Sequence, residues 1–128
     1  ALRYPVFVGG QNYNGAPDMI RTPMLRAMIE THLAEEAHAL PKALWLPLGP
    51  KAEQAVMHLV GQGLLPRDHV LTGMPHPSGA NAERVSVFLG RKNPAHASRQ
   101  TNAPKLIEAA HRLSQQIHSL EVNPGEAA

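Results

Sequence analysis

The sequence contains no cysteine, which excludes disulfide bonds and thiolate metal sites. It also lacks the arrangement of basic, apolar and small residues that marks a signal peptide. Disulfides are typical of oxidising compartments and rare in the cytosol, so their exclusion leaves a cytoplasmic location as our expectation. No apolar run approaches the ~20 residues that a membrane-spanning helix needs, so we expect no membrane partner.

Several motifs for cofactors and metals are missing as well. The chain has no Gly-rich P-loop, no G-x-G-x-x-G turn and no H-E-x-x-H pair, although it contains 8 histidines. We therefore expect neither a cofactor nor a bound metal.

The chain has 128 residues, of which 43% are hydrophobic. That length and composition predict a single globular domain over residues 1–121, followed by a flexible tail over 122–128. The first residue is Ala1 rather than Met, and an apolar run begins almost at once. This start indicates a processed or shortened chain.

Strand-like and helix-like segments alternate along the sequence. The predicted strands are 4–8, 43–48 and 69–72, and the predicted helices cover about 22–38, 50–61, 81–89 and 106–120. Because the strand segments are apolar throughout, with Trp45 in the middle of one, they are typical of a parallel sheet covered on both faces. We therefore predict a three-layer α/β/α fold with a short parallel sheet. In such folds ligands bind beyond the carboxyl ends of the strands, which places a site at loops 9–15 and 73–81.

The loop after the third predicted strand contains His76 between Pro75 and Pro77. Two flanking prolines restrict the backbone, so the imidazole is held in a defined position. A lone histidine in a loop can be structurally neutral, but this one precedes a helix and a basic segment. We therefore expect it to have a function.

These loops resemble the uracil-DNA glycosylase superfamily. His76-Pro77-Ser78 is similar to that family's second conserved motif, and the segment 48–53 is similar to the one upstream of it. Residues 7–13 are similar to the strand and loop that read the uracil base. Order and spacing are closest to the single-strand-selective monofunctional branch, over roughly residues 4–92. The resemblance implies that the chain is the C-terminal portion of a uracil-DNA-glycosylase-like fold, in a protein that hydrolyses the N-glycosidic bond of uracil or a related damaged base in DNA.

The resemblance also implies roles for individual residues. Asn12 and Tyr13 correspond to the base-binding segment, where an asparagine amide supplies both a donor and an acceptor to the pyrimidine edge. Asn12 could equally be a turn residue, because Asn-Tyr-Asn-Gly favours turns. Asn14 is the alternative equivalent if the loop is shifted.

His76 corresponds to the catalytic histidine that donates a hydrogen bond to uracil O2 and so stabilises the negative charge of the departing base. The residues after it correspond to the loop that presses on the DNA backbone and helps to extrude the nucleotide. We expect DNA contacts from Ser78, Gly79, Asn81, Arg84, Arg91 and Lys92. Gly79 stands where the common pattern has proline, and polar residues replace the usual apolar wedge, so contact with single-stranded DNA is favoured over insertion into a duplex.

A basic segment follows this loop. Arg84, Arg91, Lys92, Arg99 and Lys105 have no Asp or Glu between them, which raises the local positive potential enough to hold phosphates. The alternative is an ordinary solvated surface.

The family's first motif, which carries the residue that positions the hydrolytic water, should precede Tyr4, where this chain has no equivalent. Residues 9–12 are faintly similar to that motif, but the proline and aromatic residue that should follow are missing. We therefore expect the isolated chain to be inactive, and its exposed sheet edges to be covered by a preceding segment or by self-association.

Two further hypotheses remain open. One is a non-catalytic nucleic-acid-binding or regulatory domain on the same fold. The other is an unrelated α/β domain in which the His76-Pro77-Ser78 sequence occurs by coincidence. This hypothesis predicts no salt-dependent DNA binding.

Overall fold

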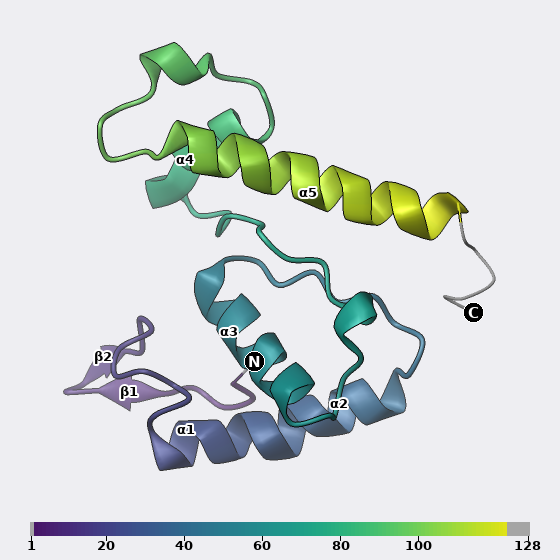
Figure 1. The fold of residues 1–128 in the computed structure, drawn as a ribbon. Helices are drawn as coiled ribbons and strands as arrows, with labels where there is room; N and C mark the ends of the chain where they lie inside the picture. The colour runs from purple at the N-terminus through teal and green to yellow at the C-terminus, as the bar shows by residue number, and fades with distance from the viewer. Residues whose placement is uncertain (1, 123–128) are drawn as a thin grey trace. The chain divides into compact units, whose positions relative to one another are not determined.

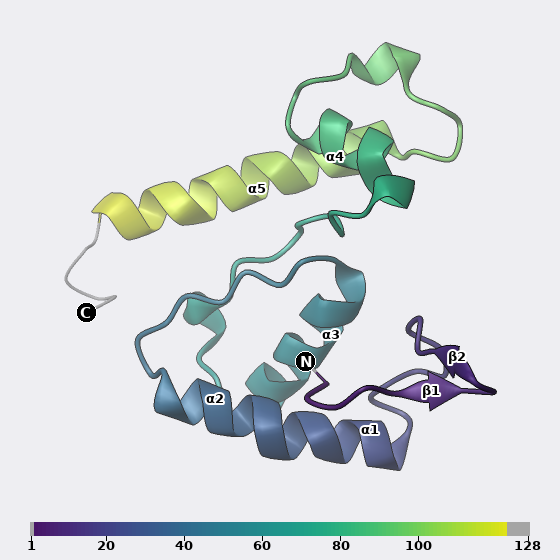
Figure 2. The same cartoon turned by 180° about the vertical axis from the view of Figure 1, so that it is seen from behind.

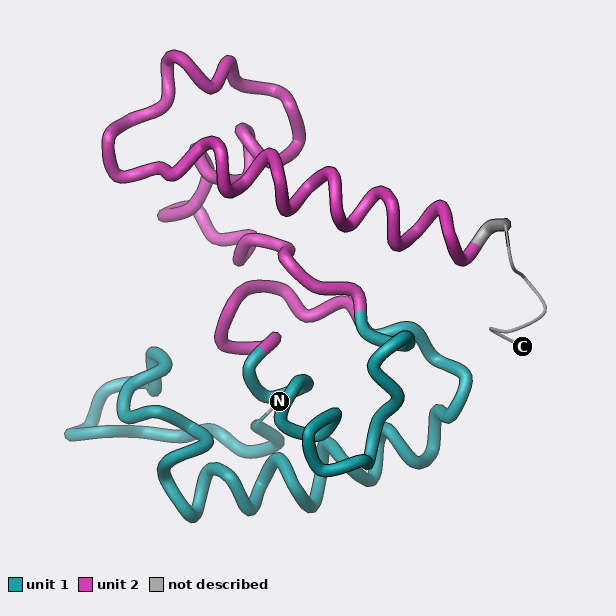
Figure 3. Tube along the Cα trace, viewed as in Figure 1, with its two compact units in different colours: residues 1–45, 54–70 teal, residues 46–53, 71–128 magenta. Residues whose placement is uncertain are grey.

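The computed structural model describes residues 2–122 and is mostly helical, at 53%. Its Cα trace divides into two compact units (Figure 3). Unit 1 comprises residues 1–45 and 54–70, and unit 2 comprises residues 46–53 and 71–128. Among the described residues, no helix is both long and apolar enough to cross a membrane.

One long helical run forms the base of unit 1 (Figure 1). It consists of α1 (Pro23–Met28), a π-helical turn (Ile29–Leu33) and α2 (Ala34–Ala39). Its buried residues Leu25, Ile29, Leu33 and Ala37 recur every four positions. In an α-helix with 3.6 residues per turn, each such step rotates about 40° further round the axis. The wider π turn reduces this drift and keeps the four side chains on one face.

The start of this helix follows from local chemistry. Thr22 has extended backbone geometry and precedes Pro23 at the first helical position, where proline's missing N–H costs nothing. The Thr22 hydroxyl makes no capping bond but donates to the Asp18 carbonyl at 2.7 Å. Asp18 Oδ1 instead accepts hydrogen bonds from the backbone N–H groups of Ile20 and Arg21 at 2.9 and 3.0 Å.

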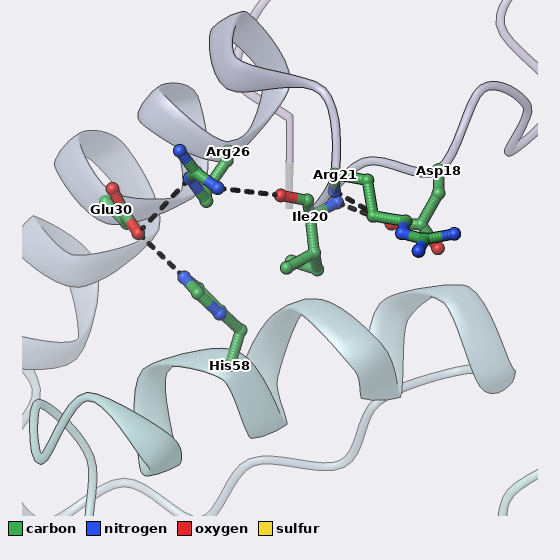
Figure 4. A network of polar contacts seen from close by, with 6 residues as sticks. All are labelled: Asp18, Ile20, Arg21, Arg26, Glu30 and His58. Atoms are coloured by element: carbon green, nitrogen blue, oxygen red, sulfur yellow. Dashed lines mark hydrogen bonds and ion pairs between the residues drawn. The ribbon is translucent and has the colours of Figure 1, made fainter.

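Helix α3 (Pro50–Gly61) packs on this run through Ala55, Val56 and Leu59, which join the core of unit 1. A polar contact beside the core strengthens the packing (Figure 4). Glu30 Oε1 lies 2.8 Å from His58 Nε2 on α3 and 3.8 Å from Arg26 Nε on α1. Both the apolar face and this bridge hold α3 against the long helical run.

The first predicted strand is a hairpin rather than one strand of a parallel sheet. β1 (Phe7–Val8) pairs antiparallel with β2 (Gln11–Asn12) in the register Phe7 with Asn12. Gly9 and Gly10 between them have φ of 56° and 76°, the combination that a two-residue hairpin turn needs. Phe7 is 63% exposed, so the prediction that this strand is buried is wrong.

The prediction of a three-layer α/β/α fold with a short parallel sheet is therefore wrong. Within the described residues the sheet consists of the two antiparallel strands β1 and β2. The other two predicted strands, 43–48 and 69–72, do not form. A single isolated parallel bridge joins them, between Trp45 and Val70 in unit 1. Pro47 has no N–H to continue a ladder, and the segment 43–48 leaves Leu44 exposed. Trp45 is half-buried beside the core of unit 1 rather than fully inside it.

Unit 2 is built around two helices, α4 (Ala82–Phe88) and α5 (Ala103–Val122), which pack together (Figure 2). Their core contains Leu71, Phe88, Ala109 and Leu113. Asn102 begins α5 by accepting a hydrogen bond from the Lys105 N–H at 3.1 Å. All four predicted helical regions are thus helical, and the tail predicted over 122–128 lies outside the described residues except for Val122, where α5 ends.

Candidate functional site

The loop that carries His76 is fixed to the first turn of α3 within unit 2. The Gly49 N–H donates to the Met74 carbonyl at 3.1 Å. The Gly73 N–H donates to Glu53 Oε2 at 2.8 Å. Nothing in the local sequence indicates that the Glu53 carboxylate reaches a loop 20 residues further along the chain.

Gly49 and His76 are packed directly against each other. A Cβ atom built on Gly49 would lie 2.7 Å from the His76 Cβ and 3.1 Å from its Cα. Gly49 also has φ of +100°, a conformation that residues with a side chain rarely adopt. Glycine is therefore required at position 49 both for its backbone conformation and for the space that His76 occupies.

The His76 side chain is presented at the surface of unit 2. Its neighbour Pro75 is buried, whereas His76 is exposed. Among the described residues, no hydrogen bond or ion pair engages the His76 ring. The Ser78 N–H donates to the His76 carbonyl at 2.9 Å, which closes a tight turn after it. The histidine has a fixed backbone and ring nitrogens that are free for a ligand.

Three of the predicted DNA-contacting residues are linked to one another. Asn81 Nδ2 donates to Ser78 Oγ at 3.0 Å, and Arg84 Nη1 donates to Asn81 Oδ1 at 2.9 Å. Gly79 lies between them in a short 3-10 turn (Gly79–Asn81) with open space around its Cα. The structure thus brings Ser78, Gly79, Asn81 and Arg84 together on one polar surface, on which Gly79 and Arg84 are exposed and Ser78 and Asn81 are half-buried.

Glu83 is a second residue whose contacts the local sequence does not indicate. Its carboxylate accepts from Lys92 Nζ at 2.6 Å, from the Ser98 N–H at 3.1 Å and from the Thr101 hydroxyl at 2.6 Å. These hydrogen bonds, led by the one from Lys92, hold the pKa of Glu83 well below its usual value. Glu83 immediately precedes the basic segment, and it pairs with one of that segment's cations.

The five basic residues of that segment are consequently not equivalent. Lys92 is ion-paired to Glu83, and Arg84 is bound to Asn81. The other three are exposed, and among the described residues no hydrogen bond or ion pair engages their side chains. These three are Arg91, Arg99 and Lys105.

The predicted base-binding residues lie in unit 1. Asn12 is exposed in β2, and its side-chain amide has no hydrogen-bond partner within the described chain. Tyr13 is half-buried beside the core, and its hydroxyl donates to the Pro17 carbonyl at 2.6 Å. Burial raises the pKa of Tyr13, and the Asp18 carboxylate raises it further. Asn14 Oδ1 accepts from the Ala16 N–H at 3.2 Å, a turn contact, so the Asn12 amide is the freer of the two.

No group of three or more His, Cys, Asp or Glu side chains in the described part of the chain could hold a metal ion. Within unit 2, the side chains on and after the His76 loop are a histidine, the Asn81 amide, the Ser78 hydroxyl and arginines. They can donate hydrogen bonds to an anionic or carbonyl oxygen and attract phosphate.

Comparison with known proteins shows similarity to a bacterial protein. No protein-family model matches the chain, and no solved structure matches it. The chain is 39% identical over 93 residues to the uncharacterized protein YoxB of Bacillus subtilis (strain 168). The match covers 71% of this chain and 36% of YoxB, so the chain spans about a third of that relative's length. The relative's name states no activity.

Proposed function

We propose that the protein carrying this chain is a uracil-DNA-glycosylase-like hydrolase that acts on uracil or a related damaged base in DNA. The observation that carries the proposal is the presentation of His76. Its backbone is fixed against Gly49, its side chain is exposed, and it stands in the His-Pro-Ser sequence of the resemblance. The proposal depends on this loop and not on the three-layer fold.

The chemistry assigned to His76 is stabilisation of a leaving anion. When the bond between C1′ of the sugar and N1 of uracil breaks, the bonding electron pair stays with the base, and charge accumulates on O2. An imidazole N–H aimed at O2 lowers the energy of that state. Water then supplies a hydroxyl group to C1′ and a proton to the base. Asn12 is proposed to recognise the pyrimidine edge, with Tyr13 beside it.

The other proposed partner is the DNA backbone, which we assign to the polar surface after His76 and to the free arginines. We place the protein in the cytoplasm. The residue that activates water is not recognisable in this sequence, so the 128-residue chain by itself is expected to release little uracil. Self-association and cover by a preceding segment also stay proposals, although the parallel sheet whose edges they would have covered is not found among the described residues.

The test is release of uracil from a single-stranded oligonucleotide by the full-length protein. The His76→Ala variant is expected to be slower by roughly 100- to 1000-fold, the range for loss of one hydrogen-bond donor to a developing anion. His111→Ala is the matched control, because His111 is exposed on α5 and has no role in the proposal. Uracil release at the wild-type rate by His76→Ala would contradict the role of this histidine.

A second candidate is a nucleic-acid-binding protein without excision activity. It is favoured by the linked side chains of Ser78, Asn81 and Arg84, which are polar where the resemblance expects an apolar wedge. Salt-dependent binding of single-stranded DNA by the full-length protein, with no base released at any enzyme concentration, would select this function over the first.

A further inference from the structure

The loop between α4 and α5 has little apolar packing to define its shape. It runs over residues 90–102 and contains a single 3-10 turn (Pro94–His96). None of its side chains is buried, and only those of Lys92, Ala97 and Thr101 are even partly covered. A segment of this kind takes a defined conformation only if polar contacts hold it.

Glu83 supplies most of these contacts from α4. Its two carboxylate oxygens accept four hydrogen bonds, from Lys92 near one end of the loop and from Ser98 and Thr101 near the other. An ionised carboxylate has only acceptor sites, and hydrogen bonds to a charged group are stronger than neutral ones. One side chain therefore fastens both ends of the loop to the same point on α4.

The hydrogen bonds of Glu83 determine which cations of the basic segment are available to bind phosphate. Lys92 Nζ is 2.6 Å from Glu83 Oε1, so its charge is neutralised inside the unit. Arg91 precedes Lys92 and Arg99 follows Ser98 in the sequence. Both guanidinium groups are exposed, and no hydrogen bond or ion pair to the described residues engages them. Guanidinium groups bind phosphate oxygens in a bidentate manner.

We propose that Glu83 is a positioning residue that holds loop 90–102 in a phosphate-binding conformation, and that Arg91 and Arg99, not Lys92, contact the DNA backbone. The proposal rests on the proposed function in one respect, namely that the ligand is DNA. It assigns Glu83 and Arg99 roles that the resemblance does not supply.

The direction in which one substitution changes the DNA affinity distinguishes this proposal from a simple effect of charge. Glu83→Gln removes a negative charge beside the basic segment, which by charge alone would tighten DNA binding. If Glu83 positions the loop, the same change weakens binding. Affinity for a fluorescent single-stranded oligonucleotide is measured with the full-length protein across a range of salt concentrations. Each phosphate contact contributes about 0.7 to the slope of log K against log salt for a single strand.

The arginines and the lysine give different expected slopes. The slope is negative, and Arg91→Ala combined with Arg99→Ala reduces its magnitude by about 1.4, which corresponds to the loss of two phosphate contacts. Lys92→Gln keeps a donor to Glu83 and leaves the slope unchanged. Arg112→Gln is the charge-matched control, because Arg112 pairs with Glu108 on the exposed side of α5, and it also leaves the slope unchanged.

A double variant tests the positioning role with every charge in place. Ser98→Ala with Thr101→Val removes two of the four hydrogen bonds, those donated by the two hydroxyls, and leaves the bonds from Lys92 and from the backbone N–H of residue 98. It is expected to lower both the affinity and the magnitude of the slope. Hydrogen exchange of the loop amides is expected to quicken in this variant and in Glu83→Gln. Binding is measured well below the unfolding temperature, where the variants are folded. A change in slope then reports fewer phosphate contacts and not a loss of folded protein.

The outcomes separate the two proposals. If the wild-type protein binds DNA, tighter or unchanged binding by Glu83→Gln overturns the positioning role and leaves the proposed function intact. A slope lowered by Lys92→Gln, with no change in the double arginine variant, overturns the assignment of the cations. Absence of salt-dependent binding by the wild-type protein overturns both the DNA ligand and this inference.

Discussion

Glu83 shows how one carboxylate can organise a segment that apolar packing leaves undefined. Its hydrogen bonds favour the ionised form, so the pKa is lower in the folded protein than in the unfolded chain. For such a group, the stabilisation is complete above the unfolded pKa and is lost as the pH falls toward the folded pKa. With a usual value of 4.5 for glutamate, the contribution of Glu83 is constant at neutral pH and declines only below that value.

The first prediction follows from that sign. The Glu83 carboxyl resonance, followed by NMR as the pH is lowered, is expected to titrate below the usual 4.5. The amide of Ser98 should lose its protection from hydrogen exchange over the same acidic range. In Glu83→Gln, Ser98 protection should be low and independent of pH. A midpoint at or above the usual value in the wild-type protein would show that the four hydrogen bonds do not form.

A second prediction concerns Gly49. Gly49→Ala introduces a Cβ at 2.7 Å from the His76 Cβ and a residue with a side chain at φ of +100°. Backbone strain of this kind costs of order 1–3 kcal/mol, and relief of the clash displaces His76. Denaturant unfolding measures the loss of stability, and the His76 ring resonances report the displacement.

Gly79→Ala is the control for Gly49, because nothing lies within 4 Å of an added Cβ there and no positive φ is involved. Its stability is expected to stay within about 0.5 kcal/mol of the wild type. Equal effects of the two alanines would mean that the close packing of Gly49 on His76 is not required.

At the scale of elements, helices and strands differ in how well local sequence predicts them. The helix predicted over about 22–38 is present as the helical run 23–39, which buries Leu25, Ile29 and Leu33 on one face. The segment 4–8 is equally apolar, yet it forms one arm of a hairpin with exposed side chains. The informative signal was the Gly9-Gly10 pair followed by two more extended residues, which is a hairpin pattern and not merely the end of a strand.

The third prediction tests that hairpin. Gly10→Ala places a side chain at φ of +76°, which costs roughly 1–2 kcal/mol for a residue other than glycine. The cross-strand contact between Phe7 and Asn12 should weaken or disappear in NOE spectra. Gly61→Ala, at the end of α3 where nothing lies within 4 Å of the added methyl group, should leave the hairpin contact unchanged. A hairpin of unaltered population in Gly10→Ala would exclude the two-residue turn.

For the molecule as a whole, the apolar core is divided between the two units. The buried cluster that contains Leu59 and the one that contains Leu113 have no residue in common. Each cluster is formed mainly by the faces of helices, and the polar contacts of Glu30 and Glu83 lie at different helices. Stability is therefore expected to be local to each unit.

The fourth prediction is that a cavity in one cluster affects one unit. Leu59 is 0% exposed, and Leu59→Ala should cost about 2–5 kcal/mol. Hydrogen exchange should quicken in α1 and α2, whereas the amides of α5 keep their protection. Leu64→Ala is the control, since Leu64 is 50% exposed and should change stability by no more than about 0.5 kcal/mol. Equal loss of protection in α5 would show that the two units unfold as one.

The sequence by itself determined the positions of the helices and the presence of a histidine loop held between prolines. Both are local properties, because helical periodicity and proline restriction act within a few residues. Only the tertiary structure decided that the apolar segments 43–48 and 69–72 share one isolated bridge instead of a parallel sheet. It also decided that Glu83 neutralises Lys92 and that Gly49 packs on His76. Strand pairing and side-chain contacts join residues far apart in the chain, and which of them meet depends on the packing of the whole unit.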